Sequence, residues 1–500
     1  MVKYWQIGVR VLVLTGLMIS ILVAKTEAQT PASGKPNFLI IVTDDQGYAD
    51  LSAFRHAAPD VRTPNMDRLA ASGVLFTQAY TTAPVCSPSR AGWNTGLYQQ
   101  RWDAKSGWAP GMPGNIRNIA EIMKSNGYAT ARFGKNDYGK GYHVQNTPEY
   151  PLNHGYDEFL GFSAHGHDYF LLSEDIEKQT PDPRGHSAVV GPLMHNEGFK
   201  SFEEGYTTDI FSDAAIDFFK GHQEEPFFVT LSYNSVHHLI HQVPKTYLDK
   251  FGVREIPDYD PETMGNYETW FKRYIRLGEI SDDEMRRYYL ANLNCLDDNI
   301  GRVLDALDDL SLAEKTVVIF FSDNGGPPTT GAWNLPLAGS KFTLWEGGIR
   351  VPFMISRPGA PQTGSVSERP VSMLDVLPTC LRAAGVEIPE GLDGRVITEA
   401  FDRNPAVTED RSLFWSWNGG YAVRSGDWKL LHRGGTGGRP PCRGIVERTN
   451  LLQSTCLFNL QKDPSESQNL INEHPEIVER LQKEYETWQE SVVGSHAETQ

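Results

Sequence analysis

"NFLIIVTDD", residues 37–45, is an apolar run rich in β-branched residues that ends in two carboxylates. Such a run predicts a buried strand of a parallel sheet, with polar side chains at its carboxyl end. "TVVIFFSDNGG" (316–326) repeats the pattern, and "PFFVTLSYNSVHH" (226–238) ends in histidines instead. Because α/β sheets bind ligands at the carboxyl ends of their strands, the residues that close these runs are candidates for a functional site.

Helical patterns lie between the strand-like runs. "TPNMDRLAASG" (63–73) has a Thr-Pro start, "NIRNIAEIMKSNG" (115–127) stops at a glycine, and residues 281–310 form a long amphipathic stretch. Strands and helices therefore alternate, and this order predicts an α/β sheet covered by helices.

The character of the chain changes after "LDGR" (392–395). Strand-like runs and a terminal helical segment follow, namely "RSLFWSW" (411–417), "YAVRSGDWKLL" (421–431) and "HPEIVERLQKEYETWQE" (474–490). We therefore expect a larger unit over residues 34–398 and a smaller α+β unit over residues 399–495.

Composition limits the class of protein. The 500 residues are 40% hydrophobic and 11% aromatic, as expected of a chain that packs a core. Lys and Arg number 46 against 63 for Asp and Glu, a net charge of -17, which argues against a nucleic-acid binder or a binder of anionic membranes. A local group of basic residues can still bind an anion, because salt screens exposed charges beyond roughly 8 Å.

The first 28 residues have the features of a secretory signal peptide. Lys3 and Arg10 precede an apolar run from Val11 to Ala24, and small residues follow up to Ala28. A membrane anchor is disfavoured, because the apolar run is shorter than the roughly 20 residues that a span needs. We therefore expect a secreted or periplasmic protein.

Export would place the chain where disulfides persist, yet it has five cysteines, an odd number. Cys442 and Cys456 flank a short loop and could bridge each other, whereas Cys295 and Cys380 fall in apolar helical segments typical of core residues. Cys86, in "PVCSPSR" (84–90), is the thiol left over.

Oxygen ligands gather at the predicted strand ends. Hard cations such as Ca²⁺ prefer carboxylate and amide oxygens, and the candidates are Asp44, Asp45, Asp323 and Asn324. Adjacent acidic residues also occur simply as turn or capping residues, and that alternative stays open here.

Four basic residues elsewhere in the chain are candidates to join this site: Arg90, Lys135, His237 and Lys341. Singly, each could be an ordinary surface or core residue. Together with a metal ion and a helix N-terminus after Cys86, they would form a site for a tetrahedral oxyanion.

"CSPSRAGWNTG" (86–96) matches the signature C-x-P-S-R-x-x-x-x-T-G at every fixed position, and the chain resembles the type I sulfatases of the alkaline-phosphatase-like superfamily. The resemblance covers residues 36–470. It includes "PNFLIIVTDDQGY", "TPNMDRLAASGVLF", "GYATARFGK", "HGYDEFLGF", "PFFVTLSYNSVHH", "LDDNIGRVLDAL", "FFSDNGG", "AGSKFTLWEGGIRVPF", "MLDVLPTCLRAAGV" and "LFNLQKDPSESQNL". It implies a large central mixed sheet flanked by helices and a smaller C-terminal α+β subdomain with an antiparallel sheet and a helix.

The resemblance also implies a chemistry. A maturation enzyme oxidises the signature cysteine, here Cys86, to formylglycine (3-oxoalanine), whose hydrate attacks sulfur and later expels sulfate. One Ca²⁺ per chain is then held by Asp44, Asp45, Asp323, Asn324 and the modified residue 86. Arg90 orients residue 86, while Lys135, Lys341 and His237 bind the sulfate.

One position departs from the family pattern. Most relatives have G-K-W-H-x-G where this chain has "GKNDYG" (134–139), so Asp137 replaces a histidine that assists sulfate elimination. Asp137 is therefore a candidate catalytic base. Alternatively it points away from the substrate, and His238 or His143 takes that role.

Histidines and aromatic residues near the predicted pocket suggest a sulfated saccharide as substrate. We predict substrate contacts for His165 and His167 in "FSAHGHDYF" (162–170) and for His238 in "SVHHLIHQ" (235–242). An algal polysaccharide such as ulvan, carrageenan or fucoidan ranks first and a glycosaminoglycan second. A phosphoesterase of the same superfamily and an inactive sulfoglycan-binding protein are the rival functions, and neither a nucleic-acid partner nor a membrane anchor is expected.

Overall fold

The computed structural model describes residues 34–103, 111–138, 145–180, 188–267, 269–271, 280–360, 363–402, 411–433 and 454–497. The predicted signal peptide, His143 and Cys442 lie outside these ranges. Within them, no helix combines the length and the apolar character that a bilayer span requires.

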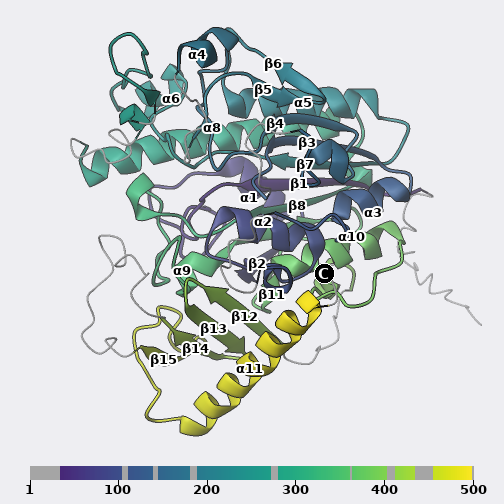
Figure 1. The fold of residues 1–500 in the computed structure, drawn as a ribbon, viewed down its shortest axis with the longest axis vertical. Coiled ribbons are helices and arrows are strands. Elements are labelled where there is room, and N and C mark those ends of the chain that lie inside the picture. Colours follow the sequence, from purple (N-terminus) through teal and green to yellow (C-terminus); the bar gives the residue numbers. More distant parts are fainter. Residues whose placement is uncertain are drawn as a thin grey trace, which may run out of the picture. The chain divides into compact units, whose positions relative to one another are not determined.

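A large mixed sheet forms the centre of the chain. Among the described residues it has eleven strands, namely β1 (Asn37–Thr43), β2 (Val74–Tyr80), β3 (Ala129–Lys135), β4 (Glu158–Phe162), β5 (Leu193–His195), β6 (Gly198–Lys200), β7 (Phe227–Ser232), β8 (Thr316–Ser322), β9 (Arg350–Ser356), β10 (Ser365–Ser367) and β11 (Val371–Ser372). Their order is β10-β2-β9-β8-β1-β7-β3-β4-β5-β6, and β11 pairs with β2. The sheet is shown in Figure 1.

The middle of this sheet is parallel, and its edges are antiparallel or mixed. β8, β1, β7, β3 and β4 run parallel to one another, whereas β9 is antiparallel to both β8 and β2, and β5 is antiparallel to β4. Three of the parallel strands, β1, β7 and β8, are the apolar runs that open the sequence argument. Their carboxyl ends consequently lie at one edge of the sheet.

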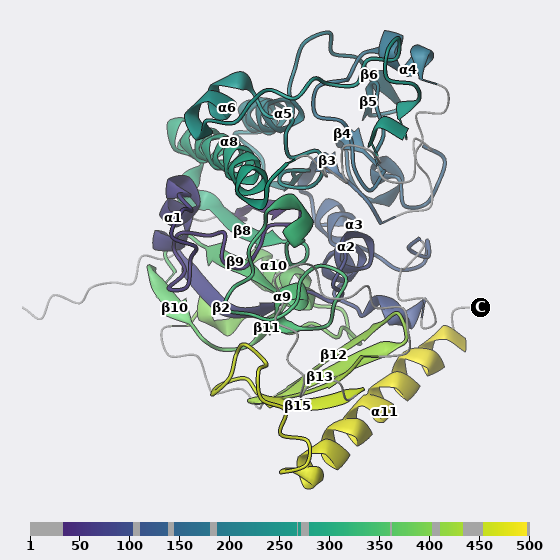
Figure 2. The ribbon, with the colours of Figure 1, turned by 90° about the vertical axis from the view of Figure 1, so that its left-hand side faces the viewer.

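Helices cover both faces of the sheet, as the full burial of β1 requires. The described helices of this part of the chain are α1 (Pro64–Ala71), α2 (Cys86–Thr95), α3 (Ile119–Ser125), α4 (Glu174–Gln179), α5 (Thr207–Gly221), α6 (Lys245–Phe251), α8 (Asp282–Asp309), α9 (Glu346–Ile349) and α10 (Val376–Ala384). Leu39 and Ile41 pack with α1, α5 and α8, while Phe38 and Ile40 pack with α2, α3 and α10. Figure 2 shows α1 and α8 on one side of β8 and β9, and α2 and α3 on the other.

A second, antiparallel sheet follows. It consists of β12 (Ser412–Trp417), β13 (Gly420–Ser425), β14 (Trp428–His432) and β15 (Thr455–Asn459), and α11 (Pro475–Ala497) packs along it. Phe414 and Trp488 stack with ring centroids 5.2 Å apart, and Tyr421 stacks on Tyr485 at 4.1 Å. The α/β class with an additional antiparallel sheet and helix is confirmed.

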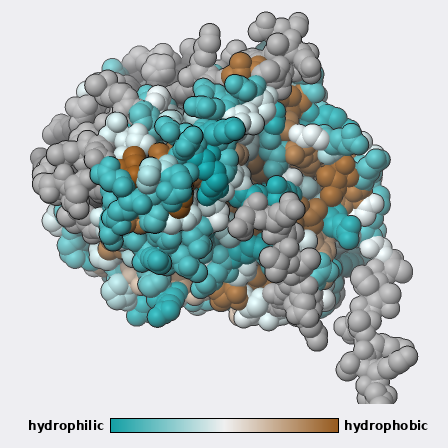
Figure 3. Space-filling view, turned by 90° about the horizontal axis from the view of Figure 1, so that it is seen from below, coloured by the Kyte–Doolittle hydropathy of each residue, from teal (hydrophilic) through white to brown (hydrophobic). Residues whose placement is uncertain are grey.

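Hydrophilic residues make up most of the coloured surface in Figure 3.

A buried charge cluster joins the second sheet to the loop before β9. Lys429 of β14 lies 2.9 Å from Glu346 Oε1 and 2.8 Å from Glu466 Oε1, and all three side chains are inaccessible to solvent. Glu466 Oε2 also accepts a hydrogen bond from the backbone N–H of Glu346 at 2.7 Å. Because a buried charge is costly without a partner, this cluster ties β14 to the segment that begins α9.

Candidate active site

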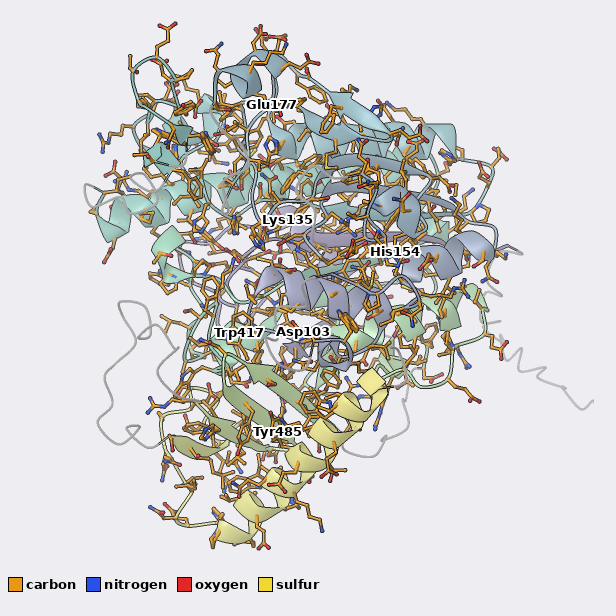
Figure 4. The ribbon with its side chains drawn as sticks, viewed as in Figure 1. Asp103, Lys135, His154, Glu177, Trp417 and Tyr485 are labelled. Atoms are coloured by element: carbon orange, nitrogen blue, oxygen red, sulfur yellow. The ribbon has the colours of Figure 1, made fainter. Side chains whose placement is uncertain are left out.

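Functional side chains converge at the carboxyl ends of the four central parallel strands. Asp44 and Asp45 follow β1, and Asp323 and Asn324 follow β8. Lys135 is the last residue of β3, and His237 lies five residues beyond β7. In Figure 4, Lys135 lies at the level of the central strands, clearly separated from Trp417 and Tyr485 of the second sheet and its helix.

Cys86 is the first residue of α2, which places it at a helix N-terminus beside these strand ends. Its Sγ lies 3.5 Å from Asp44 Oδ1 and 3.2 Å from Lys341 Nζ. Burial raises the pKa of the thiol well above its usual value, although Lys135 and Lys341 lower it in part. The unmodified thiol is therefore protonated near neutral pH and is a weak nucleophile.

The acidic residues form a compact cluster that suits a metal ion. One ligand atom each from Asp44, Asp45, Cys86 and His237 lies within 4.8 Å of the others. Burial raises the pKa of Asp45 and of Asp323, and a divalent cation at this point would stabilise their ionised forms.

Asn324 adds an amide to the cluster. Its Nδ2 donates to Asp45 Oδ1 at 2.7 Å, while its Oδ1 is buried and accepts no hydrogen bond from the described residues. A buried carbonyl oxygen without a donor has the free lone pairs that a hard cation takes. The donor set therefore fits a cation that prefers oxygen ligands.

Arg90, on α2, forms hydrogen bonds to residues of the cluster. Its Nε donates to Asp323 Oδ2 at 2.9 Å, and its Nη1 donates to Ser232 Oγ at 2.5 Å and to the carbonyl of Lys135 at 3.3 Å. The guanidinium is fully buried, so these contacts fix its plane. Ser232 was not predicted; its only sequence signal is its place at the carboxyl end of β7.

Two lysines bring positive charge to the same point. Lys135 Nζ lies 2.8 Å from Asp44 Oδ2, and Lys341 Nζ lies 2.6 Å from Asp45 Oδ1. Burial lowers their pKa values, but the carboxylates raise them more, and both values lie above the usual range. Both ammonium groups are therefore charged, and each is paired with a carboxylate.

His237 lies against the cluster with its Nε2 3.7 Å from Asp45 Oδ2. Burial and the charges of Lys341 and Lys135 lower its pKa well below the usual value, so the imidazole is neutral. The predicted residues Cys86, Arg90, Lys135 and Lys341 thus share one site with His237, the carboxylates and Asn324.

Asp137 lies at the edge of the site, in a left-handed backbone conformation with φ 45°. Its Oδ2 is 3.2 Å from Lys135 Nζ, and its Oδ1 is 2.8 Å from His165 Nδ1. Burial would raise its pKa, but His165 and Lys135 lower it to about 2. Asp137 is therefore ionised, and it connects a sulfate-binding candidate to a substrate-binding candidate.

The other two histidines predicted to contact substrate differ in their surroundings. His238 has its ring centroid 4.5 Å from that of His237 and 6.1 Å from that of Phe271. His167 is fully buried, with its Nδ1 2.7 Å from the carbonyl oxygen of Asp168. Substrate contact by either residue stays a prediction, and the burial of His167 leaves it no exposed surface.

Two family models match the chain. A model described as "Sulfatase" matches residues 36–386, and one described as "N-sulphoglucosamine sulphohydrolase, C-terminal" matches residues 340–491.

Individual proteins are similar over most of the chain. Arylsulfatase J from Mus musculus is 29% identical over 91% of this chain and 76% of its own length. N-acetylgalactosamine-6-sulfatase from Homo sapiens is 28% identical over 92% of this chain and 86% of its own. A crystal structure of Ps i-CgsB in complex with k-i-k-neocarrahexaose is 29% identical, with a TM-score of 0.72 over 91% of this chain and 93% of that one.

Proposed function

The chain belongs to the sulfatase family and is a sulfuric ester hydrolase, and we propose that it removes sulfate from a sulfated saccharide through residue 86. The observation that carries this proposal is the position of Cys86, within 3.5 Å of both Asp44 and the ammonium group of Lys341. An anion placed there meets two buried lysines, whose positive charge stabilises the charge that develops on a departing group.

Each basic residue has a distinct task in this proposal. Lys135 and Lys341 bind the sulfate oxygens as point charges, and His237 contributes a neutral ring that can donate or accept a hydrogen bond. Arg90 holds Asp323 and, through Ser232 and Lys135, the end of two strands. It therefore positions other groups rather than contacting sulfate.

The metal ion and the formylglycine that the family uses both fit residues of this chain. Asp44, Asp45, Asp323, Asn324 and residue 86 would hold one Ca²⁺, whose positive charge draws electron density from sulfate oxygens. Formylglycine derived from Cys86 by a maturation enzyme would supply, as its hydrate, an oxygen nucleophile in place of the protonated thiol.

We infer that Asp137 positions His165. A carboxylate whose pKa is about 2 accepts a proton weakly at neutral pH, so Asp137 is poorly suited to act as the base itself. Its contact with Nδ1 fixes the orientation of His165, whose side chain is 38% exposed and can be reached from solvent. His165 then takes the acid–base role that the departure from the family motif leaves open.

The substrate we propose is a soluble sulfated carbohydrate. Two relatives support it: the human relative is named for N-acetylgalactosamine 6-sulfate, and the structure of Ps i-CgsB contains a neocarrahexaose. An algal polysaccharide or its oligosaccharides ranks first, with glycosaminoglycans as the alternative. A secreted or periplasmic location, proposed from the first 28 residues, would bring the enzyme to such polymers.

The decisive experiment examines residue 86 and sulfate release in the same preparation. Trypsin cleaves after Arg68 and Arg90, so mass spectrometry of peptide 69–90 from protein made in its native host reports conversion of the thiol to the aldehyde. The same preparation is assayed for free sulfate with sulfated oligosaccharides, and for phosphate with phosphomonoesters.

We expect the aldehyde, sulfate release and little phosphate release. Cys86→Ala should abolish sulfate release, whereas Cys380→Ala, at a buried position of α10, serves as the matched control and should retain it. An unmodified thiol with no release of either anion would favour a sulfoglycan-binding protein, and preferential phosphate release would favour a phosphoesterase.

A further inference from the structure

Phe342 follows Lys341 directly, and the ammonium group of Lys341 lies between the Phe342 ring and Cys86 in the chain of contacts. The Lys341 ammonium is 5.5 Å from the centroid of the Phe342 ring and 3.2 Å from Cys86 Sγ. The backbone N–H of Phe342 donates to the carbonyl of Pro84 at 2.8 Å, which fastens it to the segment that leads into α2. The ring is therefore held within reach of whatever is attached to a bound sulfate.

The backbone at Phe342 is strained. Residues 340–343 form a tight turn in which Thr343 N–H donates to the Ser340 carbonyl at 3.0 Å. Phe342 is the third residue of this turn and has φ 70°, a conformation that favours glycine and that bulky side chains rarely adopt. A phenylalanine here costs conformational energy that a glycine would not.

Burial of the ring offsets that cost only in part. Phe342 is 40% exposed, whereas most large apolar side chains in the described ranges are buried. Three of the six large apolar side chains that are well exposed in the described ranges belong to one loop, the segment from η4 (Pro328–Thr330) to α9: Trp333, Leu335 and Phe342. Strained and exposed residues of this kind are typical of ligand-binding positions.

We propose that the Phe342 ring binds the ring of the alcohol that carries the sulfate ester, a pyranose or an aryl ring. This proposal rests on the proposed function and names a residue that determines which esters are accepted. The charged groups around Cys86 recognise the sulfate, which all substrates share, and an apolar ring beside them recognises the part that differs between substrates.

The test compares Phe342→Gly and Phe342→Trp with the wild type, using matured protein. The probes are 4-methylumbelliferyl sulfate and N-acetylgalactosamine 6-sulfate, with inorganic sulfate as a competitive inhibitor. Phe199→Ala is the matched control, because Phe199 is also well exposed but lies on β6, at the edge of the sheet and five strands from β1. A thermal unfolding scan checks that each variant folds, and the glycine variant should unfold no earlier than the wild type.

We expect Phe342→Gly to raise KM for a ring-bearing ester five- to twentyfold with little change in kcat, and Phe342→Trp to stay within threefold. The inhibition constant of inorganic sulfate should stay within twofold, because the ring does not touch sulfate. Phe199→Ala should change neither value.

Two results would overturn the role of Phe342 and leave the proposed function intact. One is an unchanged KM in an active glycine variant, and the other is a sulfate inhibition constant that weakens in parallel with KM. The second result would mean that the ring serves only to support Lys341. If the matured wild type releases sulfate from neither probe nor from any sulfated oligosaccharide, the proposed function fails and this proposal with it.

Discussion

Replacing Asp137 with asparagine tests whether this residue positions His165 or acts by itself. The substitution keeps the shape of the side chain and removes the charge that lies 2.8 Å from His165 Nδ1 and 3.2 Å from Lys135 Nζ. The pKa of Asp137 falls from 3.8 to about 2, which corresponds to about 2 kcal/mol in favour of the folded state with an ionised carboxylate. We therefore expect Asp137→Asn to lower the free energy of unfolding by about 2 kcal/mol at pH 7.

The stability that Asp137 contributes depends on pH, because its pKa is lower in the folded state. A carboxyl group whose pKa is lowered on folding stabilises the protein above its unfolded pKa, and this contribution is lost as the pH falls through about 2. The stability difference between wild type and Asp137→Asn should narrow as the pH falls below about 4. Urea unfolding followed at several pH values measures it.

The kinetics of a double-mutant cycle show how Asp137 acts in the reaction. A lost charge-assisted hydrogen bond to His165 would lower kcat/KM by roughly 10- to 100-fold in Asp137→Asn. If Asp137 acts through His165, the same substitution in a His165→Ala background should change kcat/KM less than about threefold. An undiminished effect in that background would refute the positioning role and would identify Asp137 as an independent base.

Four further predictions concern the charges of the site and of the second sheet. Arg90→Lys should lower kcat at least about 100-fold, because a lysine cannot hold Asp323 and Ser232 together, and a sulfate-release assay measures it. Chelation by EDTA should abolish activity and lower the unfolding temperature, and added Ca²⁺ should restore both; an unchanged unfolding temperature would argue against a bound cation. Lys429→Met should destabilise the fold by about 3–5 kcal/mol, because it removes the cation that the buried Glu346 and Glu466 share and leaves Glu346 with the more distant Arg350, and a loss below about 1 kcal/mol in urea unfolding would contradict this. The pKa of Glu466 is raised from 4.5 to about 7, so its contribution to stability is complete below about pH 4.5 and is lost as the pH rises through about 7; Glu466→Gln should therefore lose less stability than the wild type between pH 5 and pH 8.

The central sheet could be predicted because its signals are local in the sequence. The run before Asp44 and the run before Asp323 each show burial on both faces and end in ligand-type residues, and parallel neighbours necessarily bring such ends together. The signature around Cys86 adds the helix that starts at the same edge. These features need no knowledge of tertiary contacts.

Other features of the site depend on contacts that no pattern encodes. The pair Asp137 and His165 forms only because Asp137 adopts a left-handed conformation, and this turns its carboxylate toward a loop 28 residues away. Likewise, the sequence does not reveal that Phe342 takes a conformation typical of glycine, or that Ser232 accepts from Arg90. Each depends on a single backbone torsion or on one buried partner.

The cluster around Lys429 bears on how this enzyme can be divided or recombined. Glu346 begins α9, five residues after Lys341, and forms ion pairs with Lys429 of β14 at 2.9 Å and with Arg350 at 3.5 Å. A fragment that stops before β14 would lose the shorter of these two ion pairs, and a chimera that takes its C-terminal sheet from a relative would lose it too unless that relative carries the matching lysine. Any crossover point chosen for such grafts should therefore keep Glu346, Lys429 and Glu466 from one parent.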